Sequence, residues 1–160
     1  MVSIQLTGDI RRLNNKLRRL SNLDFAGLNE QLAEGVKTST RLRFKTGTDP
    51  EGKPWEPTTR GGKILVLTAR LRNSIRARAD ASGFAVGTNA IYAARHQFGD
   101  KRPMTIKAKS KHGLRFKNKD GKWRTKQSVT VKVPARPFMG ISKSDLEEIK
   151  QTMEQAVQEE

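Results

Sequence analysis

The sequence predicts an α+β fold, in which a small antiparallel sheet packs with several helices and a basic β-hairpin arm projects from the body. Three observations support it. Apolar residues recur at helical spacing near both ends of the chain, they alternate with polar residues as in strands in the second half, and Gly, Pro and Asn separate these segments. The 160 residues suit one domain, residues 1–160, and a 34% hydrophobic content allows a modest core.

A first helix is expected over residues 9–20. Its apolar residues share one face, and these are Ile10, Leu13, Leu17 and Leu20. The other face is basic. The apolar face is predicted to pack on the core or on a neighbouring subunit. A membrane-surface helix is the alternative, which the lack of Trp and Phe disfavours.

A second helix is predicted to begin after Asp24, whose side chain is a suitable N-cap. The residues expected on its buried stripe are Phe25, Leu28, Leu32, Val36, Leu42 and Phe44. Gly35 lies inside this helix, where glycine costs about 1 kcal/mol relative to alanine. Its presence indicates a close packing contact at that point.

Residues 45–62 are predicted to form a loop, because closely spaced prolines and glycines exclude a regular element. Trp55 in this loop is expected to fill an apolar slot on the same domain or, alternatively, on a neighbouring subunit. A short helix should follow, capped by Thr68, with Leu67, Leu71 and Ile75 on one face.

A hairpin is predicted next, turning at Ser82 and Gly83. Ile91 to Phe98 fits a short helix that ends at Gly99 in the left-handed conformation. His96 in this helix is expected to be a packing or hydrogen-bonding residue, with general-base chemistry the less favoured alternative.

Residues 101–133 are predicted to form the basic β-arm, inserted between two segments of the body. Residues 101–140 hold 13 basic groups and one acidic group. Phe116 and Trp123 are expected to pair across the turn at residues 118–121. Base stacking or docking on another protein is the alternative. The candidates for contact with DNA or with an acidic partner are Lys107, Lys109, Lys111, Arg115, Lys117, Lys119, Lys122, Arg124 and Lys126.

The C-terminal segment, residues 142–160, is predicted to be an amphipathic helix. Ser142 and Asp145 have the spacing of a capping box. Its apolar face consists of Leu146, Ile149, Met153 and Val157, and its acidic face of Glu147, Glu148 and Glu154.

The net charge of +16 favours a polyanionic partner: nucleic acid, an anionic membrane face or an acidic protein surface, with a merely solvated surface as the plain alternative. No cysteine is present, and the two histidines lack the spacing of zinc ligands. No nucleophile elbow or phosphate-binding loop is visible, so we expect no enzyme activity, cofactor or metal. The N-terminus lacks the apolar core of a signal peptide, which favours the cytoplasm.

Six blocks in order carry a resemblance to a known family. They are Arg43-Phe44, residues 49–55, residues 64–75, Val86-Gly87-Thr88-Asn89 with Tyr92-Ala93, residues 96–99, and residues 134–141. Together they resemble the phage virion-morphogenesis or tail-completion proteins of Mu-like and P2-like contractile-tailed phages. Two departures exist: Ala69 stands where the family pattern has glycine, and the basic arm is longer than a minimal member needs.

The resemblance implies a non-enzymatic structural protein that forms a ring, expected to be hexameric, at the head–tail junction of the virion. Its partners would be neck or connector proteins, tail terminator or tail tube proteins, and DNA in the lumen. The residues expected to have structural or assembly roles are Trp55, Tyr92, His96, Phe98, Arg136 and Phe138. The four aromatic rings should pack loops onto the body, and Arg136 should bond backbone carbonyls or a carboxylate. The alternative function is that of a cytoplasmic nucleic-acid-binding protein that uses the basic arm without sequence specificity.

Overall fold

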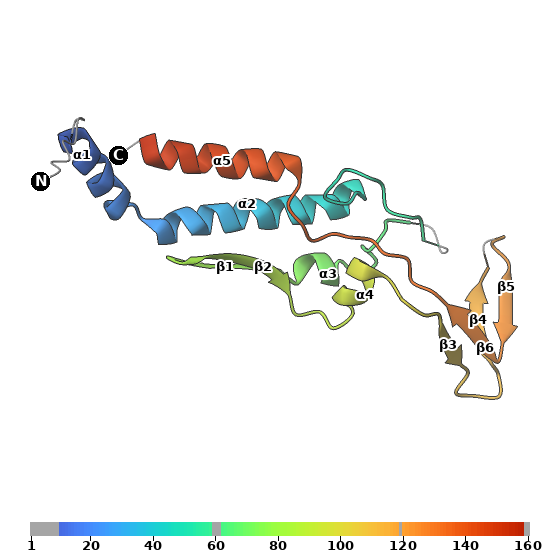
Figure 1. The fold of residues 1–160 in the computed structure, drawn as a ribbon. Coiled ribbons are helices and arrows are strands. Elements are labelled where there is room, and N and C mark those ends of the chain that lie inside the picture. Colours follow the sequence, from blue (N-terminus) through green and yellow to red (C-terminus); the bar gives the residue numbers. More distant parts are fainter. Residues whose placement is uncertain (1–9, 59–61, 119, 159–160) are drawn as a thin grey trace, which may run out of the picture.

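A computed structural model describes residues 10–58, 62–118 and 120–158 (Figure 1). Two long helices lie side by side and antiparallel: α2 (Phe25–Thr46) and α5 (Lys143–Gln158). The first helix, α1 (Ile10–Asn22), precedes α2 and lies beyond the far end of this pair (Figure 1). The three helices form an elongated half of the molecule.

A β-hairpin packs against α2 on the side opposite α5 (Figure 1). Its strands are β1 (Ile75–Asp80) and β2 (Gly83–Thr88), paired so that Ile75 lies opposite Thr88. Two short helices, α3 (Arg70–Asn73) and α4 (Ala93–Phe98), flank the hairpin in sequence. The helix α2 is therefore the central layer of the body.

Four more strands lie at the end of the molecule away from α1 (Figure 1). The strand β3 (Met104–Lys107) pairs antiparallel with β6 (Ser128–Val131), and β4 (Leu114–Lys117) pairs antiparallel with β5 (Trp123–Lys126). The predicted α+β class is confirmed, although the strands form three two-stranded sheets and not one. That residues 101–133 act as a separate arm stays a prediction.

The ends of α2 follow from local chemistry. The Asp24 side chain accepts a hydrogen bond from the Gly27 amide at 3.0 Å, which is the predicted N-cap. The helix ends at Gly47, whose positive φ of 75° lets its amide bond back to the Arg43 carbonyl at 2.7 Å. In α5 the predicted capping box is also present, with reciprocal bonds between Ser142 and Asp145.

The core lies where α2, the hairpin and the loops meet. Its buried residues are Phe44, Trp55, Leu71, Ile75, Ala93 and Phe138. The predicted stripe of α2 is partly wrong, since Phe25 and Leu42 are 45% and 54% exposed.

The predicted helix around residue 70 is shorter than expected. Ala69 is the N-cap of α3, so the cap at Thr68 is wrong, and Ile75 already belongs to β1. Leu67 is exposed. Ala69 adopts a left-handed conformation with φ of 54°, which explains why glycine suits this position.

The predicted pairing of Phe116 with Trp123 is wrong. Phe116 lies opposite Arg124, and Trp123 lies opposite Lys117. A shift of one residue moves a side chain to the other face of a strand, so the two rings are on opposite faces. Five residues, 118–122, separate the paired positions, with a hydrogen bond from the Asn118 amide to the Lys122 carbonyl.

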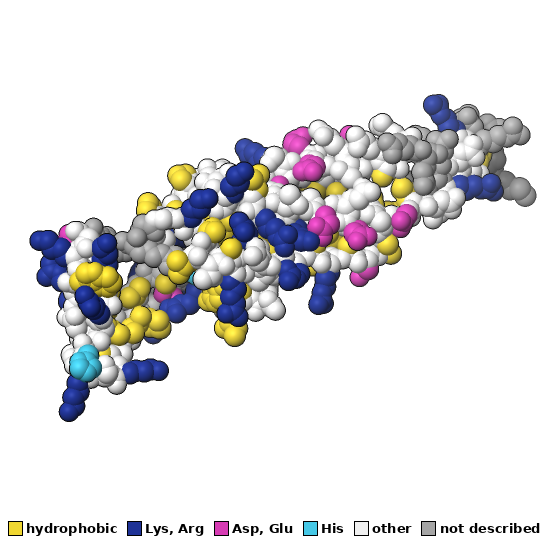
Figure 2. All heavy atoms as spheres, turned by 180° about the vertical axis from the view of Figure 1, so that it is seen from behind, with side chains coloured by type: hydrophobic (Ala, Val, Ile, Leu, Met, Phe, Trp, Pro, Cys, Tyr) yellow, Lys and Arg dark blue, Asp and Glu magenta, His cyan; other side chains and the backbone are white. Residues whose placement is uncertain are grey.

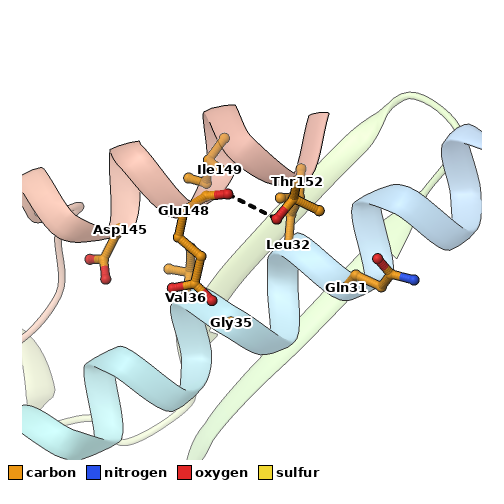
Figure 3. A pocket seen from close by; sticks show the side chains of 8 residues that line it. All are labelled: Gln31, Leu32, Gly35, Val36, Asp145, Glu148, Ile149 and Thr152. Carbon is orange, nitrogen blue, oxygen red and sulfur yellow. Dashed lines mark hydrogen bonds between the residues drawn. The ribbon is translucent and has the colours of Figure 1, made fainter. Parts of the chain in front are cut away.

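The seam between α2 and α5 contains a hollow of about 240 Å³ beside Gly35 (Figure 3). A Cβ atom added at Gly35 would meet only the Glu148 carboxylate, at 3.6 Å, which is an ordinary contact. The close packing expected at this glycine is therefore absent. Among the described residues, no helix is long and apolar enough to span a bilayer.

Candidate functional site

The residues that sequence analysis singled out meet around one segment, residues 133–141, which we call the return strap. It leads from β6 back to α5 and crosses the body beside α2 (Figure 1). The strap has no regular secondary structure, so side chains from other elements satisfy much of its backbone. Four attachments join the strap to the rest of the body.

An aromatic cluster forms the first attachment. The rings of Phe44 and Trp55 meet edge to face with centroids 5.6 Å apart, and the Phe138 centroid lies 5.3 Å from that of Phe44. Trp55 is 4% exposed and its indole nitrogen donates to the Pro137 carbonyl at 2.8 Å. The predicted slot for Trp55 is therefore on its own domain.

Arg136 forms the second attachment. Its guanidinium donates to the carbonyls of Glu56 (2.8 Å) and Pro57 (3.3 Å), which realises the expected bonding to backbone carbonyls. Its own amide donates to the His96 carbonyl at 2.6 Å. Burial lowers the pKa of Arg136, and the Glu56 carboxylate opposes that effect. The Arg136 side chain thus joins the strap to the Trp55 loop, and its backbone amide joins the strap to α4.

Gln97 forms the third attachment, which sequence analysis missed. Its amide oxygen accepts from the backbone amides of Phe138 and Met139, each at 3.0 Å, and its amide nitrogen donates to the Met139 carbonyl at 3.0 Å. The Gln97 side chain of α4 therefore makes hydrogen bonds with three backbone groups of the strap. The sequence signal was its place in the block at residues 96–99.

The fourth attachment is a buried cation that also escaped sequence analysis. Arg43 donates to the carbonyls of Phe138 (3.1 Å) and Gly140 (2.7 Å) and forms an ion pair with Asp145 at 2.5 Å. Burial alone would raise the pKa of Asp145, but hydrogen bonds from Ser39 and Ser142 and the charge of Arg43 outweigh it and lower the pKa. Arg43 thus joins α2, the strap and α5.

A separate set of hydrogen bonds joins the two ends of the segment that holds β3 to β6. The Asp100 carboxylate accepts two hydrogen bonds from Arg95 and one from the Val133 amide, while the Asp100 amide donates to the Val133 carbonyl. The hydrogen bond from Arg95 lowers the pKa of Asp100. Gly99 is needed here, because a Cβ atom would lie 2.7 Å from the Ala135 nitrogen.

The other predicted site residues lie at the edge of this arrangement. Tyr92 is 37% exposed, and its ring meets that of His96 edge to face at 5.9 Å. Burial and the charges of Arg136 and Arg95 lower the pKa of His96, so the imidazole is neutral at pH 7. Phe98 is 78% exposed, so its predicted packing against the body is wrong for the isolated chain.

The predicted contact residues of the basic segment lie mostly on β3, β4, β5 and their loops, and Lys119 falls outside the described residues. The other eight are exposed. The Arg115 guanidinium lies 4.9 Å from the centroid of the exposed Trp123 ring. An open groove of about 1040 Å³ separates these strands from the body, and it combines apolar side chains such as Ile106 and Phe116 with the cationic Lys132.

A family model described as the phage virion morphogenesis family matches residues 7–158. The chain belongs to this family. No curated protein and no solved structure matched the chain. The match covers all four strap attachments of this virion morphogenesis protein, together with the segment that holds β3 to β6.

The four attachments join α2, α4, α5 and the Trp55 loop to the strap. Within the described ranges, no group of three acidic or histidine side chains could hold a metal ion. The side chains of Arg43, Gln97 and Arg136 are engaged with backbone groups of the strap and of the Trp55 loop, whereas the buried Nδ1 of His96 has no hydrogen-bond partner among the described residues. In this virion morphogenesis protein the site therefore holds segments from distant parts of the sequence in a fixed relation.

Proposed function

We propose that this chain is a non-enzymatic structural protein that closes into a ring, expected to be a hexamer, at the head–tail junction and joins the tail to the capsid. The family match over residues 7–158 carries the proposal, because virion morphogenesis is its described role. The protein would be made in the host cytoplasm and remain in the virion. Its neighbours would be connector or neck proteins on one side and tail terminator or tail tube proteins on the other.

The strap geometry supports this role. Arg43 of α2 and Gln97 of α4 bind the strap, and Arg136 of the strap binds the loop that holds Trp55, so the body resists deformation when neighbours press on it. Several large apolar side chains remain exposed, among them Ile91 (98%) and Phe98 (78%). Such side chains are suited to burial between subunits. We assign Tyr92 and Phe98, at the edge of the site, to those contacts.

The distribution of charge also supports a ring. Figure 2 shows Lys and Arg spread from the β3–β6 end across the middle of the molecule, and most of the Asp and Glu of this face on the helical half. Head-to-tail contacts that close on themselves join two different surfaces of neighbouring copies. The acidic face of α5 would meet a basic face of the next copy, while the remaining lysines of the β3–β6 segment face DNA in the lumen or an acidic protein.

Charge reversal tests this pairing. Replacing Glu147 and Glu154 with Lys should weaken ring assembly, measured by light scattering and negative-stain microscopy, and Glu148 is kept because its carboxylate lies in the seam with α2 beside Gly35. A matched control reverses two exposed glutamates on another surface, Glu30 and Glu34, and should leave assembly intact. Unchanged rings in the first variant would count against the α5 contact.

A second function, nonspecific nucleic-acid binding, is favoured by the eight exposed cations and by the Arg115–Trp123 stack. A protein with this function should bind DNA as a monomer, with an affinity that falls steeply as salt rises. A head–tail protein should form rings, or restore tails that lack it, even where its affinity for isolated DNA is negligible.

A further inference from the structure

The helix α1 has an apolar stripe that the other described residues leave largely exposed. Ile10, Leu13 and Leu17 are 53%, 56% and 55% exposed, although they recur at spacings of three and four along one face. A helix of 13 residues is marginal in water unless that face is packed. The stripe therefore requires an apolar partner.

A second uncovered stripe runs along α5. Ile149 and Thr152 face α2, whereas Leu146, Met153 and Val157 lie beside them on the helix and are 46%, 48% and 50% exposed. Their spacings of seven and four give a stripe on one face of the helix. The two stripes are thus alike in their apolar character.

The charges around the two stripes are opposite. The α1 sequence holds five basic residues and no acidic residue. The exposed carboxylates of Glu147 and Glu154 lie along one side of the α5 stripe, and Lys150 is the one cation within the stripe, between Leu146 and Met153. Packing α1 on α5 therefore buries apolar surface and brings unlike charges together at its edge.

The connection between α1 and α2 directs α1 away from the α5 of its own chain. Only Leu23 and Asp24 separate the helices, and the Phe25 amide donates to the Leu23 carbonyl at 2.9 Å. The Asp24 cap on Gly27 holds the same turn. Figure 1 accordingly shows α1 beyond the end of the α2–α5 pair, not alongside it. Folding α1 back along its own α5 would require this turn to be rebuilt.

We propose that α1 of one copy packs on the Leu146–Met153–Val157 stripe of α5 in a second copy. This inference rests on the proposed ring and names one of its contacts. An exchanged helix of this kind joins two different surfaces, so it propagates in one direction and is compatible with a closed ring. The basic face that the acidic α5 contacts in the neighbouring copy would then be that of α1.

Cross-linking between singly labelled chains tests the contact, because the natural chain has no cysteine. A Leu13→Cys chain is mixed with a Met153→Cys chain and treated with a short bismaleimide. We expect cross-linked heterodimers, and their loss when Asn15→Cys, on the opposite face of α1, replaces Leu13→Cys. A product formed only within a chain that carries both cysteines would overturn the proposal in favour of closure within one copy.

A second variant separates this contact from the ring itself. Leu13→Glu with Leu17→Glu places carboxylates against the acidic α5 and should abolish the rings formed by the natural chain, with the fluorescence-detected unfolding midpoint unchanged because both side chains are exposed. Rings that persist in this variant would overturn the α1 contact and leave the proposed function standing. A natural chain that neither forms rings nor restores tails would contradict both.

Discussion

Arg43 in α2 and Asp145 in α5 form an ion pair between side chains that are only 6% and 4% exposed. The guanidinium also binds the carbonyls of Phe138 and Gly140, and the carboxylate also accepts the Ser142 amide. The charges are thus compensated by hydrogen bonds on both sides, as a buried pair requires. This pair connects the last helix and the strap to the central helix.

Replacing Arg43 with Met should destabilise the fold by about 3–5 kcal/mol, because it leaves the Asp145 carboxylate buried without its cation. Urea denaturation followed by circular dichroism measures the change in the free energy of unfolding. Lys53→Met is the matched control, since its pair with Glu51 is exposed and screened by solvent, so the free energy of unfolding should change little. Equal effects of the two changes would contradict the assigned role of Arg43.

Stability should fall in acid partly through Asp145. Its pKa is lower in the folded chain than the value of about 3.9 expected when unfolded, so its contribution is present above that value and is lost as pH decreases below it. Asp145→Asn should be less stable at neutral pH and lose less stability between about pH 5 and about pH 2. A pH dependence as steep as that of the natural chain would contradict this reading.

Ala69→Gly should stabilise the fold by up to about 1.6 kcal/mol. Relief of the left-handed conformation gains about 1–2 kcal/mol, and the greater freedom of glycine in the unfolded chain costs about 0.4–1 kcal/mol. Ala156→Gly, inside α5, is the control and should destabilise by about 1 kcal/mol. Thermal unfolding of both variants checks the opposite signs.

Substitutions of the two tryptophans should have very different effects on the free energy of unfolding. Trp55→Ala removes a ring that is 4% exposed and packed on Phe44, at an expected cost of about 3–5 kcal/mol. Trp123→Phe keeps an aromatic ring at a site that is 61% exposed and should change stability by less than about 0.5 kcal/mol. Chemical denaturation of the two variants measures both, and comparable losses would contradict the assigned core.

Sequence patterns located the elements better than the contacts between them. Periodicity and capping chemistry predicted α1, α2 and α5, because those signals are local. The Arg43–Asp145 pair joins positions 102 residues apart, which no local pattern encodes. The register of β4 and β5 depends on one residue of loop length, so a turn signal alone placed Phe116 and Trp123 on the wrong faces.

The candidate site was predicted only in part, because some of its residues are marked by local sequence and others are not. Proline and aromatic residues marked Trp55, Arg136 and Phe138 as fixed points of the loops. Gln97 and Arg43 are ordinary helical residues whose role depends on the backbone of the strap. The exposure of Phe98 is a property of the three-dimensional arrangement.

The proposed joining of tail to capsid is tested most directly by disrupting the gene for this chain in the phage that encodes it. Electron microscopy of the lysate should then show separate filled heads and tails, and supplying the natural chain should restore joined, infectious particles. Joined and infectious particles made without the chain would contradict the account.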